Sequence, residues 1–281
     1  MDIITVAAHA KVNLGLRIVG RKSDGYHLLH TLFAEIDYGD SVTLTPAADG
    51  QISLKVTGPQ ADRVPAGESN LCLAAARLMQ QETGHAGGVH MGLDKQVPPG
   101  SGLGGGSSDG AAVIKGLNQL WNTGVPDDIL EVLAAELGAD VPFFIRGKVQ
   151  LGRGVGDRLA PVTLAADPAL VLVIPPLQID TRWAYSLFDG QADFAESDDY
   201  AKIAKSSPVQ WDRLQNDFEE VIFPHHPQLG EIKAALIQAG AVYAGLSGSG
   251  SAVVGLFDEV PDHLSTGDFG AAQVIETRLI H

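Results

Sequence analysis

The sequence predicts an α+β protein whose two halves meet near residues 150–165. Three observations support this prediction. Strand patterns dominate the first third of the chain, helical patterns flank a glycine-rich stretch, and the mixture of strands and helices restarts after about residue 155. The 281 residues are enough for two modest domains with real cores.

Strands are expected at residues 3–20, 31–47 and 50–58, where β-branched and alternating apolar residues are followed by Gly, Asp or Pro. A helix is expected to begin after Ser69 and Asn70, which offer an N-cap, and to end at Gly84. Further elements in this half are a strand at 87–98, helical spacing from Val113 to Trp121, and a helix that opens with Pro126 in its first turn and stops at Gly138.

The second half repeats this mixture. We expect a buried strand at 169–176, a short helix at 181–189 and a helix at 227–240. Residues 193–207 are acidic and are expected to form a solvated connection. A strand, a glycine turn and a second strand follow at 241–257, and the last strand is expected at 271–279.

Composition excludes several classes of protein. The net charge of −15 and the lack of any Lys/Arg cluster disfavour a nucleic-acid partner, and no apolar run approaches the roughly 20 residues that span a membrane. Cys72 is the only cysteine, so a disulfide within the chain and a cysteine zinc site are excluded, and we expect it in the core. The N-terminus does not resemble a signal peptide, which favours the cytoplasm.

The stretch "PPGSGLGGGSSDGAA" at 98–112 is the strongest local signal. It is not a P-loop, because no Gly-Lys-Ser/Thr occurs, and the two prolines separate its G-x-G-x-x-G from any preceding strand, unlike a dinucleotide fingerprint. A protein kinase is disfavoured by the lack of H-R-D, since the D-F-G at 268–270 has no such motif before it. A glycine loop that enters a helix capped by Ser107 and Ser108 predicts a phosphate site; a flexible linker is the alternative.

Four blocks in order resemble the GHMP kinase superfamily of small-molecule kinases. They are "AHAKVNLGLRIVGRKSDGYHLLHTLF", the glycine stretch, "LGADVPFFIRG" and "AGLSGSGSAVVGLF". The extended G-L-G-G-G-S-S form and "DGYH" resemble the branch of the non-mevalonate (MEP) isoprenoid pathway, whose substrate is 4-diphosphocytidyl-2-C-methyl-D-erythritol. The resemblance covers nearly the whole chain.

This resemblance implies a two-domain fold. Residues 1–158 would form a domain like the second domain of ribosomal protein S5, and residues 159–281 a ferredoxin-like domain. It also implies an enzyme that uses ATP as co-substrate, with Mg²⁺, to phosphorylate the C2 hydroxyl of that substrate. The implied partners are therefore two small molecules, with no nucleic acid and no membrane.

The resemblance implies two catalytic residues. Asp140 matches the family's base, although from its position alone it would be a capping or turn residue. Lys11 matches the family's catalytic lysine, although a lysine in a strand is otherwise a snorkelling edge residue. A lysine beside the aspartate and the reacting hydroxyl would keep the carboxylate ionised and stabilise developing charge.

The remaining site residues are implied in the same way. Asn13, on the same strand face as Lys11, would bind the methylerythritol part. Tyr26 and His27 would meet the cytidine end, presented by a Ser-Asp-Gly turn, and Thr181 and Tyr185 would close over the base. Ser108 is the candidate hydroxyl near Mg²⁺. The residues implied to bind ATP are Lys95, Pro98, Pro99, Gly100, Ser101, Gly102, Leu103, Gly104, Gly105, Gly106, Ser107 and Ser108.

Two other functions stay open at this point. The chain could be a different GHMP kinase, for homoserine, mevalonate or a sugar, or a non-catalytic nucleotide-binding regulator. A regulator would be expected to lack Lys11 or Asp140, and both are present. His9, His225 and His226 could suggest a metal, but no third ligand is spaced sensibly, so surface or turn positions are expected.

Overall fold

The computed structural model describes residues 3–281 except 49, 66, 68, 190–193, 195–198, 262–263 and 265–268. The chain forms two compact units, each assembled from segments that are distant in sequence. The first unit contains Met1–Ala10, Tyr38–Pro99 and Gly104–Gly147, and the second contains Lys11–Asp37, Gly100–Leu103 and Lys148–His281. These units differ from the expected domains, 1–158 and 159–281, which are consecutive in sequence. The boundary between those two domains stays a prediction.

Two long strands contribute to both units. β1 (Ile4–Arg21) and β2 (His27–Ala47) are joined by the predicted Ser-Asp-Gly turn, in which Gly25 has φ 93°. β1 passes from the first unit to the second after Ala10, and β2 returns after Asp37. The strands expected at 3–20 and 31–47 are thus confirmed, and the second begins earlier than its pattern suggested.

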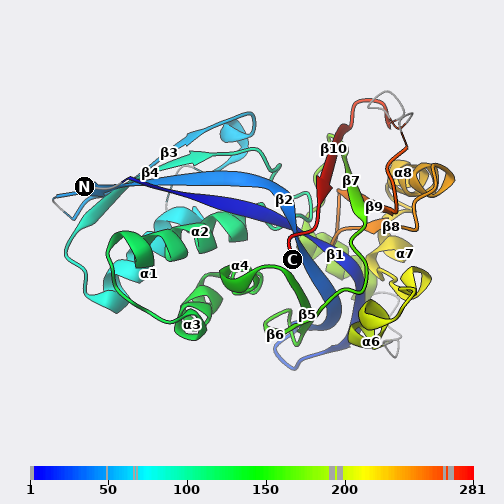
Figure 1. Cartoon of the computed structure of the whole chain (residues 1–281), viewed down its shortest axis with the longest axis horizontal. Helices are drawn as coiled ribbons and strands as arrows, with labels where there is room; N and C mark the ends of the chain where they lie inside the picture. The colour runs from blue at the N-terminus through cyan, green and yellow to red at the C-terminus, as the bar shows by residue number, and fades with distance from the viewer. Residues whose placement is uncertain are drawn as a thin grey trace. The chain divides into compact units, whose positions relative to one another are not determined.

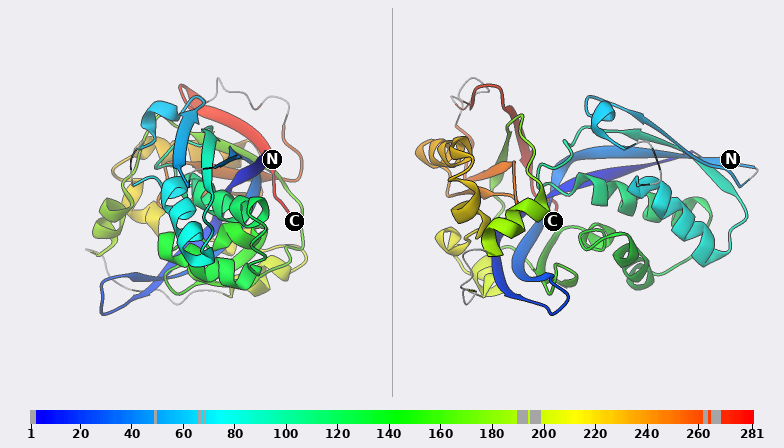
Figure 2. Two further views of the ribbon diagram at one scale, coloured as in Figure 1. Left: turned by 90° about the vertical axis from the view of Figure 1, so that its left-hand side faces the viewer. Right: turned by 180° about the vertical axis from the view of Figure 1, so that it is seen from behind.

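The first unit packs helices on one face of its strands (Figures 1 and 2). The second half of β2 pairs antiparallel with β4 (Gly88–Asp94), and β4 pairs parallel with β3 (Ile52–Thr57). The helices of this unit are α1 (Leu71–Thr83), α2 (Gly105–Leu120), α3 (Asp127–Leu137) and α4 (Phe143–Arg146). The Asn70 side chain caps α1 as expected, whereas Pro126 lies at the N-cap of α3 and not inside its first turn.

The second unit is built on an antiparallel sheet in the order β10-β7-β9-β8. Its strands are β7 (Ala169–Ile174), β8 (Tyr243–Leu246), β9 (Val253–Phe257) and β10 (Gln273–Arg278). β5 (Val149–Arg153) pairs with the first half of β2 and with β6 (Arg158–Pro161). The helices are α5 (Thr181–Asp189), α6 (Tyr200–Lys205), α7 (Phe218–Ile222) and α8 (Pro227–Gln238).

One expectation is wrong. The acidic segment 193–207 was expected to be a solvated connection, but its second part forms α6. Asp199 caps this helix by accepting a hydrogen bond from Lys202 N, and the Tyr200 ring is fully buried. The many acidic residues of this segment led us to overlook the apolar face of α6, formed by Tyr200, Ile203 and Ala204. Residues 193 and 195–198 lie outside the described part of the chain.

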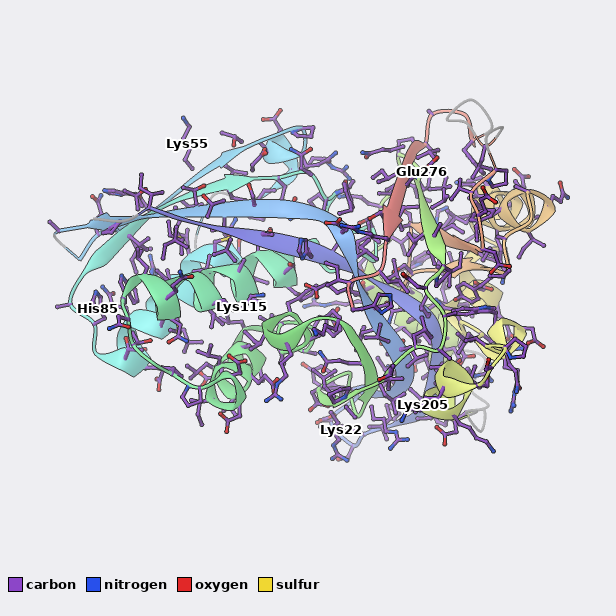
Figure 3. All side chains as sticks on the ribbon, in the orientation of Figure 1. Lys22, Lys55, His85, Lys115, Lys205 and Glu276 are labelled. Carbon is purple, nitrogen blue, oxygen red and sulfur yellow. The ribbon has the colours of Figure 1, made fainter. Side chains whose placement is uncertain are left out.

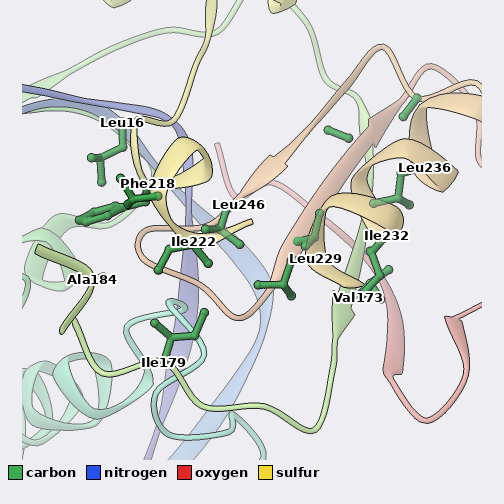
Figure 4. Close-up of a cluster of buried hydrophobic side chains, with 14 of the residues drawn as sticks. Leu16, Val173, Ile179, Ala184, Phe218, Ile222, Leu229, Ile232, Leu236 and Leu246 are labelled. Carbon is green, nitrogen blue, oxygen red and sulfur yellow. The ribbon is translucent and has the colours of Figure 1, made fainter. Parts of the chain in front are cut away.

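The core of the second unit includes residues from the N-terminal strands (Figure 4). Leu16, Ile18 and Leu29 pack in one buried cluster with the β7 residue Val173 and with apolar side chains of α7 and α8. Residues 11–37 therefore help to build the core around the C-terminal sheet. Among the described residues, no helix is both long enough and apolar enough to cross a membrane.

Candidate active site

The glycine stretch starts a helix in the first unit. Gly104 is the N-cap of α2, with φ 69°, and the first helical bond runs from Ser108 N to Gly104 O. The N–H groups of residues 105–107 make no such bond and lie at the positive end of the helix dipole, which suits an anion. Ser107 and Ser108 were expected to cap this helix, and this is wrong: both lie inside its first turns.

The Ser108 hydroxyl is engaged with the backbone of β1. It is buried and donates a hydrogen bond to His9 O at 2.6 Å. Within the described ranges, no group of three His, Cys, Asp or Glu side chains is placed to hold a metal ion. His225 and His226 instead contact the Trp183 ring edge-on, at centroid distances of 5.4 and 5.7 Å. No protein site for Mg²⁺ follows from these residues.

The first part of the glycine stretch belongs to the second unit and packs on the C-terminal glycine motif. Ala252 N donates to Ser101 O at 2.9 Å, and Ser247 Oγ donates to Gly102 O at 3.0 Å. Gly102 has φ 79°, and a Cβ there would lie 2.0 Å from Ser247 O. Two of the four sequence blocks thus meet in this unit, and the close approach requires glycine at 102.

Lys11 and Asn13 share one face of β1, as their spacing predicted. Lys11 Nζ donates to Asn13 Oδ1 at 2.6 Å and to Gly102 O at 2.9 Å, and it lies 5.5 Å from the centre of the Phe33 ring. Lys11 is only 4% exposed, so the alternative of a snorkelling edge lysine is wrong. An ammonium group is thereby fixed against the backbone of the glycine stretch.

Sequence reasoning missed the residues that hold Asn13. Its Nδ2 donates to Thr31 Oγ1 at 2.9 Å, Thr31 donates to Gly15 O at 2.6 Å, and Asn13 N donates to Ser247 Oγ at 3.2 Å. A hydrogen bond between residues 234 positions apart leaves no local signal. The one available hint was the Ser-Gly alternation around Ser247.

Asp140 lies in the first unit, in the turn between α3 and α4. Its carboxylate is partly exposed and forms no hydrogen bond or ion pair with any residue that the structure describes. The turn is held by Val141 N, which donates to Gly138 O, and by the buried Phe143 and Phe144 that follow. The backbone is therefore fixed while both carboxylate oxygens stay available.

Two of the four residues expected at the base-binding end lie together in the second unit. His27 stacks on Tyr185, with ring centroids 4.4 Å apart and planes inclined by 12°. His27 Nε2 also lies 2.7 Å from Asp189 Oδ1, a partner that the sequence did not suggest. A carboxylate at this distance orients the imidazole ring.

Thr181 and Tyr26 have different surroundings. Thr181 Oγ1 lies 3.1 Å from Ser249 Oγ in the C-terminal glycine motif. Tyr26 is 64% exposed on the hairpin turn, where Lys22 Nζ lies 6.0 Å from the centre of its ring; Lys22 extends from the tip of that hairpin (Figure 3). Its ring is open to solvent.

Lys95 is buried and paired within the first unit. Its Nζ donates to Asp40 Oδ2 at 2.5 Å and to Asp109 Oδ2 at 2.6 Å. Burial, the largest effect, raises the pKa of Asp109 to about 7, against the attraction of Lys95 and with the repulsion of Asp40. Burial disfavours the Lys95 ammonium, but the two carboxylates outweigh this and raise the pKa of Lys95. One ammonium thus serves two carboxylates.

The sequence matches both halves of the GHMP kinases. The GHMP kinases N terminal domain matches residues 70–148, and the GHMP kinases C terminal domain matches residues 193–266. The 4-diphosphocytidyl-2-C-methyl-D-erythritol kinase of Prosthecochloris aestuarii is 40% identical over 268 residues, which cover 93% of this chain and 92% of the relative. The chain belongs to the 4-diphosphocytidyl-2-C-methyl-D-erythritol kinase family.

Other comparisons agree. The family member from Chlorobium luteolum is 42% identical over 93% of this chain and 91% of its own length. A crystal structure of a 4-(cytidine 5'-diphospho)-2C-methyl-D-erythritol kinase superposes with a TM-score of 0.84 at 34% identity, covering 98% of this chain and 99% of that one. Homoserine kinase from Cytophaga hutchinsonii, at 18% identity, 99% and 95% coverage and a TM-score of 0.74, shares the fold.

These findings confirm the α+β class and the GHMP kinase fold. Kinases of this superfamily use ATP as co-substrate and act on small molecules. The roles of the individual residues in this family member stay predictions.

Proposed function

We propose that this chain transfers the γ-phosphoryl group of ATP to the C2 hydroxyl of 4-diphosphocytidyl-2-C-methyl-D-erythritol, giving the 2-phosphate and ADP. Beside the family membership, the observation that carries the proposal is the buried Lys11 ammonium, bonded to Gly102 O of the glycine stretch and to Asn13. A charge fixed in this way needs no reorganisation when negative charge develops during transfer.

ATP would bind along the glycine stretch. The N–H groups at the start of α2 would meet its phosphate oxygens, since a helix N-terminus favours anions. Mg²⁺ would arrive on the nucleotide, because this ion is usually held through one or two carboxylates and the substrate phosphates. The proposed ATP site consists of Lys95, Pro98, Pro99, Gly100, Ser101, Gly102, Leu103, Gly104, Gly105, Gly106, Ser107 and Ser108.

In the transfer itself, the C2 oxygen forms a bond to the γ-phosphorus while the bond from that phosphorus to the β–γ bridging oxygen breaks. Asp140 would accept the hydroxyl proton, a role that its open carboxylate supports. Lys11 would stabilise the charge on the reacting oxygens. In a loose transition state, holding the hydroxyl in line matters as much as removing its proton.

The acceptor would be bound at its methylerythritol end and at its cytidine end by different side chains. Asn13, held by Thr31 and Ser247, would bind the methylerythritol part. At the cytidine end, Tyr26, His27 and Tyr185 supply aromatic faces and Thr181 a hydroxyl.

The test is an ADP-release assay on the purified protein with ATP and a panel of acceptors. We expect turnover with 4-diphosphocytidyl-2-C-methyl-D-erythritol and none with homoserine, mevalonate or a sugar. Asp140→Asn should lose roughly 10²–10⁴-fold in kcat, the usual contribution of a general base, while its thermal unfolding is unchanged. Glu136→Gln, on the exposed face of α3 in the same unit, is the matched control and should keep full turnover.

Two results would contradict the proposal. Turnover with another acceptor would make the chain a different GHMP kinase. ATP binding without turnover on any acceptor would make it a non-catalytic nucleotide binder.

A further inference from the structure

Three charged side chains are buried together under the glycine stretch in the first unit. Asp40 comes from β2, Lys95 directly follows β4, and Asp109 lies in the second turn of α2. Their side chains are 0%, 3% and 5% exposed. We call these three residues the buried clamp. Its members come from three different elements, so their bonds tie those elements together.

Asp40 holds the backbone that enters the glycine stretch. Its Oδ1 accepts hydrogen bonds from Gln96 N at 2.5 Å and from Val97 N at 2.8 Å, while its Oδ2 accepts from Lys95 Nζ. Both oxygens of one carboxylate thus hold three consecutive residues. Pro98 follows directly, so the position at which the glycine stretch begins is fixed by Asp40.

Asp109 ties the same lysine to the start of α2. This helix start packs so closely on the strand exit that a Cβ at Gly105 would lie 2.9 Å from Val97 Cγ1 and 3.0 Å from Lys95 Nζ. The glycine at 105 is therefore explained by the clamp. The first residue of the helix whose N–H groups are proposed to bind phosphate therefore packs against Lys95 and Val97.

The clamp is a poor device for stability alone. Burying three charges carries a desolvation penalty, and well-packed apolar residues of similar volume often stabilise a protein as much or more. What such a cluster adds is a fixed geometry, because the bonds of Lys95 to Asp40 and Asp109 form in one arrangement of the three side chains, in which Asp109 Oδ1 has no hydrogen-bond partner among the described residues. The place where geometry matters here is the first turn of α2.

We propose that Asp40, Lys95 and Asp109 are positioning residues for ATP, which lock the first turn of α2 against residues 95–97 and so fix the N–H groups that receive the phosphates. This inference rests on the proposed function. Lys95 would thus serve the ATP site through the backbone that it supports. Loss of the clamp should weaken ATP binding, whereas turnover at saturating ATP and the KM for the acceptor should be kept.

The test measures the Kd for ATP by calorimetry, without acceptor, together with kcat and both KM values. Asp109→Leu, which removes the bond to Lys95, should raise the Kd for ATP by about tenfold or more, because small misplacements of a binding group are costly. Asp109→Asn should recover most of this loss, since its amide oxygen can still accept from Lys95. Glu131→Gln, which breaks the more exposed ion pair with Arg146 in the same unit, is the control and should change none of these values.

A second variant keeps the test decisive if Asp109→Leu does not fold. Gly105→Ala leaves all three charges in place but pushes a methyl group against Lys95 and Val97, so it should raise the Kd for ATP as well. If the clamp acts through the helix start, the effects of the two substitutions should be less than additive in a double-mutant cycle.

The outcomes separate this inference from the proposed function. If the Asp109→Leu and Gly105→Ala proteins fold and bind ATP like the wild type, the proposed positioning role of the buried clamp is wrong, whatever the acceptor is. Equal losses in kcat and in ATP binding, or no recovery in Asp109→Asn, would also overturn it. Wild-type ATP binding without phosphorylation of the proposed acceptor would overturn the proposed function and leave the clamp standing.

Discussion

At the scale of single residues, burial decides the chemistry of the charged groups. Lys11 and Lys95 are both almost fully buried, yet their surroundings differ. Lys11 meets neutral oxygens of Asn13 and Gly102, whereas Lys95 meets two carboxylates. The two lysines are thus held in different ways, Lys11 against the glycine stretch and Lys95 between two acidic side chains.

Asp109 should make stability depend on pH. Its pKa is about 7 in the folded chain, raised first by burial, against 3.8 as its ordinary value. Between about pH 4 and 7 the folded state holds a proton that the unfolded state has released, so the free energy of unfolding should fall as pH rises. The slope for this one group is at most about 1.4 kcal/mol per pH unit.

Urea unfolding of the wild type and of Asp109→Asn at pH 5 and pH 7 measures this component. Lys95 and Asp40 are the charged groups that act on Asp109, and both are retained in the variant. The wild type should lose more stability than the variant between the two pH values. Parallel pH dependence of the two proteins would contradict the assignment.

At the scale of elements, the loop between β8 and β9 and residues 100–103 form one packed piece within the second unit. Gly102 is the point of closest approach. Gly102→Ala should destabilise by more than about 2 kcal/mol, because it adds overlap with Ser247 O to the cost of φ 79° for a residue with a Cβ.

Gly84→Ala is a matched control for this substitution. Gly84 also has positive φ, 65°, but a Cβ there would meet nothing within 4 Å. The difference in free energy of unfolding between the two variants, measured in urea, therefore isolates the overlap at Gly102. Equal destabilisation would show that the second unit accommodates the methyl group.

The elements also show which parts of the site the sequence could predict. The period of a strand placed Lys11 and Asn13 on one face, and cap chemistry identified Asn70 and Gly84 at the ends of α1. These features depend on neighbours in sequence. Thr31, Ser247, Asp189 and Asp40 were missed because their contacts join residues far apart in the chain. Periodicity carries no information about such pairs.

Some short elements could not be predicted from the sequence for a related reason. β5, β6 and α7 have only four or five residues each, too few for a period to show. Cys72, by contrast, lies in a long apolar helix face and is buried as predicted.

At the scale of the whole molecule, the interleaved segments imply that the chain cannot be divided at residue 158 without damage. Leu16, Ile18 and Leu29 belong to the core cluster of the second unit. Each buried side chain of this kind contributes about 1.5–3 kcal/mol, so losing three removes roughly 5 kcal/mol or more. That is comparable to the whole stability of a typical domain, about 5–15 kcal/mol.

A fragment of residues 159–281 should therefore not fold cooperatively alone. Circular dichroism melting of this fragment should show no sharp transition, and co-expression with residues 1–158 should restore one. The intact chain is the control. A cooperative melt of the isolated fragment would contradict the inference that the N-terminal strands complete this core.

The carbonyl of Gly102 receives two donors, the Lys11 ammonium and the Ser247 hydroxyl. A carbonyl oxygen has two lone pairs, so this one has no acceptor capacity left for a ligand. An inhibitor designed against this protein should therefore match the shape of the Gly102 peptide. A hydrogen-bond donor aimed at its carbonyl oxygen would gain no binding affinity.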